Sequence, residues 1–142
     1  MFEKRDNKQK DISELGEFGL IDHLTHNLKN KQESTIQGVG DDTAVIDTGD
    51  KYMLVTKDIL LEGVHFDMTY YPLKHLGYKA ITVNLSDIYA MNGTPRQVLV
   101  GLGISSRFQV EALDELYSGM QMACDKYGVD LVGGDTTSSL RG

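Results

Sequence analysis

The sequence has 142 residues, of which 40% are hydrophobic and 25% charged, and its formal net charge is −7. A chain of this length and composition fits one globular domain with a modest core. The acidic balance disfavours nucleic acids and anionic membranes as partners, because binding to phosphate-rich surfaces depends on Lys and Arg.

Cysteine usage and hydropathy point to a reducing compartment. Cys124 is the one cysteine of the sequence, which excludes an intramolecular disulfide. It lies in the helix-like run MQMACDKYG, where a buried and inert thiol is expected. The sequence shows no apolar stretch of signal-peptide or membrane-spanning length, so we expect a cytoplasmic protein.

The first half of the chain predicts a helix followed by a hairpin. Residues 1–12 are polar, and we expect them to form a loose tail. Apolar residues at helical spacing from Ser13 to Leu28 predict an amphipathic helix that packs on the rest of the domain. The β-type runs at 43–47 and 51–59 are separated by Thr48-Gly49-Asp50, which is typical of a hairpin.

The second half predicts two helix–strand pairs. Pro72 is expected to open a long helix that ends at Asn92-Gly93, before a buried strand at 97–105. A second long helix is predicted over 107–128, with Gly128 as its end, and a short strand at 129–137 that finishes in a glycine turn. The fold class is therefore α/β, with one mixed β-sheet and helices packed mainly on one face.

The stretch GVGDDTAVID places Asp41 and Asp42 side by side in a glycine-flanked turn. Neighbouring carboxylates repel each other unless a cation lies between them. A solvated turn is the plain alternative, because Asp and Gly are common turn residues.

Aspartates also lie near the ends of other predicted elements. Asp58 lies near the end of the second strand, and Asp135 follows the last strand. Asp87 lies three residues after Asn84, so the two share a helix face. We expect the Asn84 amide to support the Asp87 carboxylate, with an unrelated amide on the helix surface as the alternative. Carboxylates that converge at one sheet edge favour Mg²⁺, which would let an acidic protein bind an anionic substrate. A nucleic-acid polymerase is a poor alternative for a short acidic chain, and a P-loop kinase is excluded because the Gly-rich loop is missing.

Five motifs resemble one enzyme family: GEFGLIDHL, GVGDDTAVI, DILLEGVHF, GYKAITVNLSDIYAMNGTP and LVGGDTT. Their order is similar to that of thiamine-monophosphate kinases, which share a superfamily with aminoimidazole-ribonucleotide synthetase and selenophosphate synthetase. The resemblance extends from about Gly16 to Thr137, nearly the whole chain.

The resemblance implies transfer of the γ-phosphoryl group of ATP to thiamine monophosphate, giving thiamine diphosphate, with several Mg²⁺ ions. It implies that residues 13–142 form an amino-terminal ATP- and magnesium-binding domain, and that a carboxy-terminal domain with much of the thiamine pocket should follow. It also implies a homodimer in which the sheets of two subunits pair into a barrel. The isolated fragment is then expected to be inactive.

The resemblance assigns site residues position by position. The magnesium ligands it implies are Asp42, Thr56, Lys57, Asp58, Asp87 and Asp135. Lys57 would act through its main-chain carbonyl, since the family commonly has Thr there. Gly134 and Asp135 match the nucleotide-binding turn, and Tyr117 either lies against the nucleotide or belongs to the core. His65 matches a contact to the thiamine phosphate, with a half-buried histidine that caps a strand as the alternative.

Two other functions stay open. The chain could belong to another member of the superfamily, a selenophosphate or purine-pathway synthetase, although the early cysteine usual in selenophosphate synthetases is missing. It could also be a non-catalytic module for nucleotide binding and dimerisation.

Overall fold

The structure is a computed structural model that describes residues 11–140. Its helical elements are η1 (Ile12–Glu14), α1 (Gly16–Thr25), α2 (Leu73–Ala90) and α3 (Val110–Tyr127). Its strands are β1 (Thr35–Gln37), β2 (Ala44–Asp47), β3 (Tyr52–Val55), β4 (Gln97–Ile104) and β5 (Asp130–Ser138). The predicted order of elements is confirmed, except that the short helix η1 and strand β1 were not predicted. The tail at residues 1–10 lies outside the described residues.

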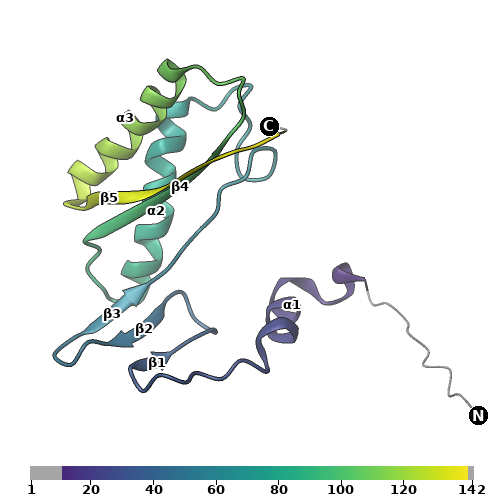
Figure 1. Cartoon of the computed structure of the whole chain (residues 1–142), viewed down its shortest axis with the longest axis vertical. Coiled ribbons are helices and arrows are strands. Elements are labelled where there is room, and N and C mark those ends of the chain that lie inside the picture. The colour runs from purple at the N-terminus through teal and green to yellow at the C-terminus, as the bar shows by residue number, and fades with distance from the viewer. Residues whose placement is uncertain (1–10, 141–142) are drawn as a thin grey trace, which may run out of the picture.

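The strands form two sheets, which corrects the expectation of a single mixed sheet (Figure 1). Strands β1, β2 and β3 make an antiparallel sheet, whereas β4 and β5 pair in parallel. Strand β3 ends at Val55, and residues 56–61 continue without strand pairing. The Asp58 N–H donates to the Asn84 side chain of α2 instead of to a neighbouring strand. The hairpin is therefore not hydrogen-bonded to β4.

The parallel pair differs from its prediction in two ways. Gly133 and Gly134 lie inside β5, which continues to Ser138, so the predicted glycine turn is wrong. Val132 is an extra residue in the β5 ladder, since Leu131 pairs with Val98 and Gly133 with Leu99. Strand β4 is not buried on both faces, because exposed and half-buried residues alternate along it and Leu99 is 73% exposed.

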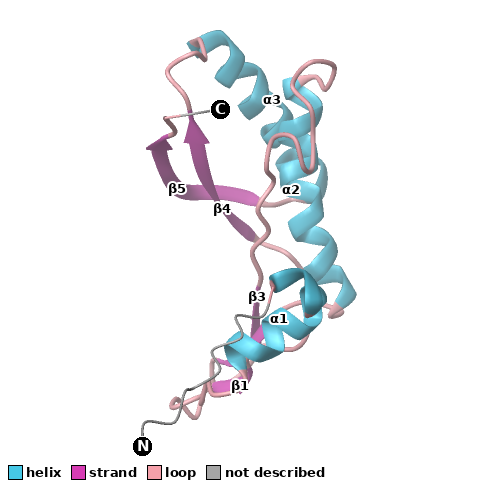
Figure 2. Cartoon of the chain, turned by 90° about the vertical axis from the view of Figure 1, so that its right-hand side faces the viewer, coloured by secondary structure: helices cyan, strands magenta, loops and turns pink. Residues whose placement is uncertain are grey.

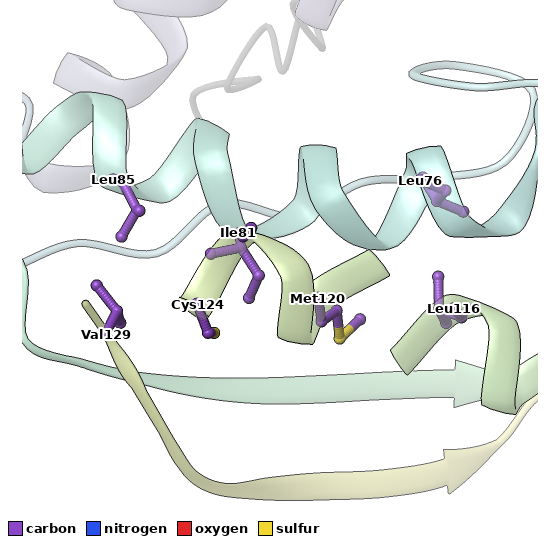
Figure 3. Close-up of a cluster of buried hydrophobic side chains, with 8 residues drawn as sticks. Leu76, Ile81, Leu85, Leu116, Met120, Cys124 and Val129 are labelled. Carbon is purple, nitrogen blue, oxygen red and sulfur yellow. The ribbon is translucent and has the colours of Figure 1, made fainter. Parts of the chain in front are cut away.

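The core lies between α2, α3 and one face of the parallel pair (Figures 2 and 3). Its buried side chains are Leu76, Ile81, Leu85, Leu116, Met120, Ala123, Cys124 and Val129. Helices α2 and α3 cover one face of the β4–β5 sheet, as predicted. Cys124 is buried as predicted, and this burial raises the pKa of its thiol. Helix α3 ends at Gly128, whose φ of 65° is a left-handed conformation that glycine adopts at little cost.

Helix α1 lies apart from α2 and α3 in Figure 1. Its predicted helical structure is confirmed, but its predicted packing is not, because Phe18 is 85% and Leu24 66% exposed. Within residues 11–140, none of the helices is both long and apolar enough to cross a membrane.

Candidate functional site

The Gly-Asp-Asp turn gives its two aspartates different environments. Asp41 accepts the Asp42 N–H at 2.9 Å and the Gln37 side-chain amide at 3.3 Å, so its carboxylate shapes the turn. The Asp42 carboxylate is exposed and takes part in none of the side-chain hydrogen bonds of residues 11–140. Thr43, directly after it, is 2% exposed and anchors the turn to the protein. Of the pair, Asp42 is therefore the carboxylate that is free to bind a ligand.

The segment after β3 lies against α2 and brings four predicted residues together. The Thr56 hydroxyl donates to Asp87 Oδ2 at 3.0 Å, and the Asp58 N–H donates to Asn84 Oδ1 at 2.9 Å. The Asn84 amide also donates to the Ala80 carbonyl at 2.9 Å, so both ends of its side chain are engaged. Asn84 therefore holds Asp58, which corrects the expectation that it supports Asp87. The carboxylates of Asp58 and Asp87 are presented from two elements far apart in sequence.

The two carboxylates interact electrostatically. Partial desolvation and the charge of Asp87 raise the pKa of Asp58, while the nearby His65 ring opposes this rise. Because the folded chain favours the protonated form of Asp58, the charged form costs stability at neutral pH.

We expect Asp58→Asn to stabilise the metal-free chain by about 0.5 kcal/mol at neutral pH, a small gain because the side chain is exposed. The Asp58 pKa is raised on folding, so wild type regains stability as the pH falls through that value and the difference disappears in acid. Urea unfolding of both proteins at a series of pH values measures this. An unchanged difference across the pH range would mean that the cost of the charged Asp58 carboxylate, from desolvation and from Asp87, is not its cause.

His65 lies in the turn that follows this segment. Its Nδ1 accepts the Leu61 N–H at 2.9 Å, and its own N–H donates to the Leu61 carbonyl at 2.9 Å. A main-chain N–H can only donate, so the neutral ring carries its proton on Nε2. The ring is exposed, which corrects the alternative of a half-buried histidine and leaves an N–H donor for a bound group.

The third part of the candidate site is an open hollow of about 320 Å³ between α3 and β5. Tyr117, Gly134 and Asp135 all line it, so the residues assigned to nucleotide binding lie together. Tyr117 is 39% exposed and is not part of the buried core. A Cβ at Gly134 would lie 1.8 Å from the Val100 carbonyl oxygen, so close strand pairing alone requires glycine there.

The full set of predicted carboxylates does not converge within this chain. Among residues 11–140, no three His, Cys, Asp or Glu side chains are close enough to hold a metal ion together. Asp58 and Asp87 form a pair, whereas Asp42 and Asp135 lie in the turn before β2 and on β5. Lys57 is exposed between Thr56 and Asp58.

Lys79 contacts the turn that carries His65, which the sequence did not reveal. Its ammonium group donates to the His65 carbonyl at 3.0 Å, although 14 residues separate the two. A lysine on an amphipathic helix is usually solvated, so its spacing gives no signal.

Comparison with known proteins gives consistent matches. The family model for "AIR synthase related protein, N-terminal domain" matches residues 40–142. The thiamine-monophosphate kinase of Aquifex aeolicus is 40% identical over 128 residues, 90% of this chain and 40% of that protein. The thiamine-monophosphate kinase of Bacillus subtilis is 36% identical over 126 residues, 88% of this chain and 38% of that protein. The chain thus spans about 40% of the length of these relatives.

Solved structures give the same result for the fold. The structure described as "AaThiL complexed with AMPPCP and TMP" matches with a TM-score of 0.83 and 38% identity, over 93% of this chain and 40% of that one. Thiamine-monophosphate kinase from Aquifex aeolicus matches with a TM-score of 0.70 and 32% identity, over 92% of this chain and 40% of that one.

Proposed function

The chain belongs to the AIR synthase related proteins, and we propose that it is the nucleotide- and magnesium-binding part of a thiamine-monophosphate kinase. The reaction would transfer the γ-phosphoryl group of ATP to the phosphate of thiamine monophosphate. The observation that carries this proposal is the pair of carboxylates, Asp58 and Asp87, held by Asn84 and Thr56 beside His65. The similarity to a structure with AMPPCP and TMP bound supports both substrates.

The side chains of the candidate site fit a magnesium ion that takes some of its ligands from substrate and water, and not a metal ion held entirely by protein side chains. Mg²⁺ in phosphoryl-transfer sites commonly takes one or two carboxylates, with substrate phosphates and water as its other ligands. Asp58 and Asp87 supply two carboxylates, and no third acidic or histidine side chain of the described chain joins them. Bound there, magnesium would neutralise the crowded phosphate oxygens. We propose Asp42, Asp135, Thr56 and the Lys57 carbonyl as further ligands, on the family resemblance alone.

This chain's residues would act by binding and orientation. The attacking oxygen of a phosphate ester is already anionic near neutral pH, so no strong general base is needed. The exposed Nε2–H of His65 can donate to the acceptor phosphate and fix its direction. Tyr117, Gly134 and Asp135 line the hollow that we assign to ATP. Alignment of the two phosphates would then supply much of the rate.

We expect Lys57→Thr to change kcat by less than about tenfold, or about 1.4 kcal/mol, in a full-length kinase that includes the carboxy-terminal domain. The proposed ligand at this position is the main-chain carbonyl, which any residue provides, and the Lys57 side chain is exposed. Steady-state kinetics with saturating ATP measures it. A loss of about a hundredfold would mean that the ammonium group acts on phosphate directly.

We further propose that two copies pair through their sheets. Large apolar side chains are exposed on the strands: Tyr52, Met53, Val55, Leu99 and Val132. A surface of this kind usually marks a contact with another protein. Equilibrium sedimentation of the chain tests this proposal, and a monomer at micromolar concentration would contradict it.

A thermal-shift screen tests the function and separates it from the alternatives. A ligand at about 100 times its Kd stabilises a protein by about 2.7 kcal/mol, so binding raises the melting temperature. ATP and thiamine monophosphate, each with Mg²⁺, should both raise it, whereas selenide and formylglycinamidine ribonucleotide should not. No shift with ATP and Mg²⁺ would contradict the proposal, whereas a shift with ATP alone would leave the thiamine phosphate contact to the carboxy-terminal domain that the resemblance implies.

A further inference from the structure

The turn that carries His65 is exposed, and hydrogen bonds among residues 61–66 hold its shape. Within it the Gly63 N–H donates to the Phe66 carbonyl at 2.8 Å, and Gly63 has a φ of 76°. Val64, at its tip, is 72% exposed. Phe66 packs against the core and fixes the far end of the turn.

Lys79 joins this turn to α2. Its ammonium group donates to the His65 carbonyl at 3.0 Å and lies 5.7 Å from the centre of the Tyr71 ring. The aromatic face favours a cation at this distance, so Tyr71 helps to hold the ammonium group in place. Lys79 is half-buried, unlike Lys74 one turn earlier on the same helix, which is exposed.

Hydrogen bonds hold His65 at its ring and at its main-chain carbonyl. The Leu61 N–H reaches Nδ1 only if residues 61–65 keep their turn, which the His65 N–H closes on the Leu61 carbonyl. The Lys79 bond holds the His65 carbonyl and so fixes the main chain of His65 at the end of this turn. With Nδ1 engaged, Nε2–H is the free donor and points away from Leu61. A hydrogen bond from a charged ammonium group is stronger than one between neutral groups.

We propose that Lys79 is a positioning residue that orients His65 so that its Nε2–H meets the phosphate of the acceptor. This inference rests on the proposed function for the identity of the acceptor, thiamine monophosphate. Lys79 would contact neither substrate, and its effect would pass through the His65 turn.

The test compares Lys79→Met, which keeps the apolar stem, with Lys79→Arg, which restores a donor, and with Lys74→Met as the matched control. Nitrogen-15 NMR of the His65 ring, at about pH 8 where a histidine is normally neutral, reports whether Nδ1 still accepts a hydrogen bond. Calorimetry measures the Kd for thiamine monophosphate and, separately, for ATP with Mg²⁺.

Lys79→Met should shift the Nδ1 signal and weaken thiamine monophosphate binding by about tenfold. ATP affinity and the melting temperature should stay near wild type, Lys79→Arg should restore most of the loss, and Lys74→Met should match wild type. An unchanged His65 signal in Lys79→Met would overturn the inference, as would an equal loss of affinity for both ligands. If wild type fails to bind thiamine monophosphate, the assignment of His65 to the acceptor phosphate fails in this chain, whereas the His65 signal still decides whether Lys79 orients the ring.

Discussion

Gly119→Ala is expected to destabilise the chain by about 3 kcal/mol or more, because α2 and α3 touch at this residue. A Cβ built on Gly119 would lie 1.8 Å from the Lys74 carbonyl oxygen, and one on Gly77 would lie 1.9 Å from the Leu116 carbonyl oxygen. These neighbours are main-chain atoms, so the helices must move apart and the core between them loses contacts. The gain in helix propensity from Gly to Ala, about 1 kcal/mol, is too small to offset this.

Thermal and urea unfolding measure the effect, with a fall in melting temperature of roughly 10 °C expected for a domain of this size. Gly103→Ala is the matched control, because a Cβ there meets nothing within 4 Å. A Gly119→Ala protein as stable as this control would show that the helices are not packed as closely as described.

Asp87→Asn is expected to weaken magnesium-dependent ATP binding by about a hundredfold, or about 2.7 kcal/mol, while the fold stays intact. The amide oxygen of Asn can still accept the Thr56 hydroxyl, so the contact between the β3 end and α2 survives. One of the two paired carboxylates is lost, however, and an amide is a poorer ligand for Mg²⁺ than a carboxylate. Removing the charge also relieves its repulsion of Asp58.

Calorimetry with saturating Mg²⁺ gives the affinity, and unfolding without metal gives the stability. Asp125→Asn, an exposed carboxylate on α3, is the control and should bind ATP like wild type. Near-normal ATP affinity in Asp87→Asn would assign Asp87 a structural role only.

The helices and the hairpin could be predicted because their signals are local. Pro72 and Gly128 mark helix ends by their own backbone preferences, and Thr48-Gly49-Asp50 marks the hairpin. The division into two sheets could not be predicted, because pairing depends on contacts between residues far apart in the sequence. The Asp58 N–H, for example, donates to the Asn84 side chain 26 residues away.

The contacts within the candidate site could not be predicted from the sequence, and the roles assigned to its residues stay predictions. The motif positions named Asp58, Asp87 and His65, and the structure brings these three into one region. Spacing could not reveal that Asn84 binds the Asp58 main chain or that Lys79 reaches His65, since both contacts depend on how the segment after β3 lies along α2. Asn84 and Asp87 share one helix face but contact different residues, Asp58 and Thr56.

The exposed apolar face of α1 shows what hydrophobic periodicity in a sequence can and cannot predict. Its spacing correctly predicts a helix, but periodicity states only that one face is apolar and not what covers it. Phe18 and Leu24 remain exposed in the described chain.

The most direct test of the account is calorimetric titration of this chain with ATP, once with excess Mg²⁺ and once with EDTA. The chain has a net charge of −7, and its proposed phosphate site is built from carboxylates, so a metal ion must supply the positive charge. The account predicts saturable binding with Mg²⁺ and a loss of affinity of at least about a hundredfold in EDTA. Equally tight binding in EDTA would contradict it, because ATP would then be held without the metal that Asp58 and Asp87 are proposed to bind.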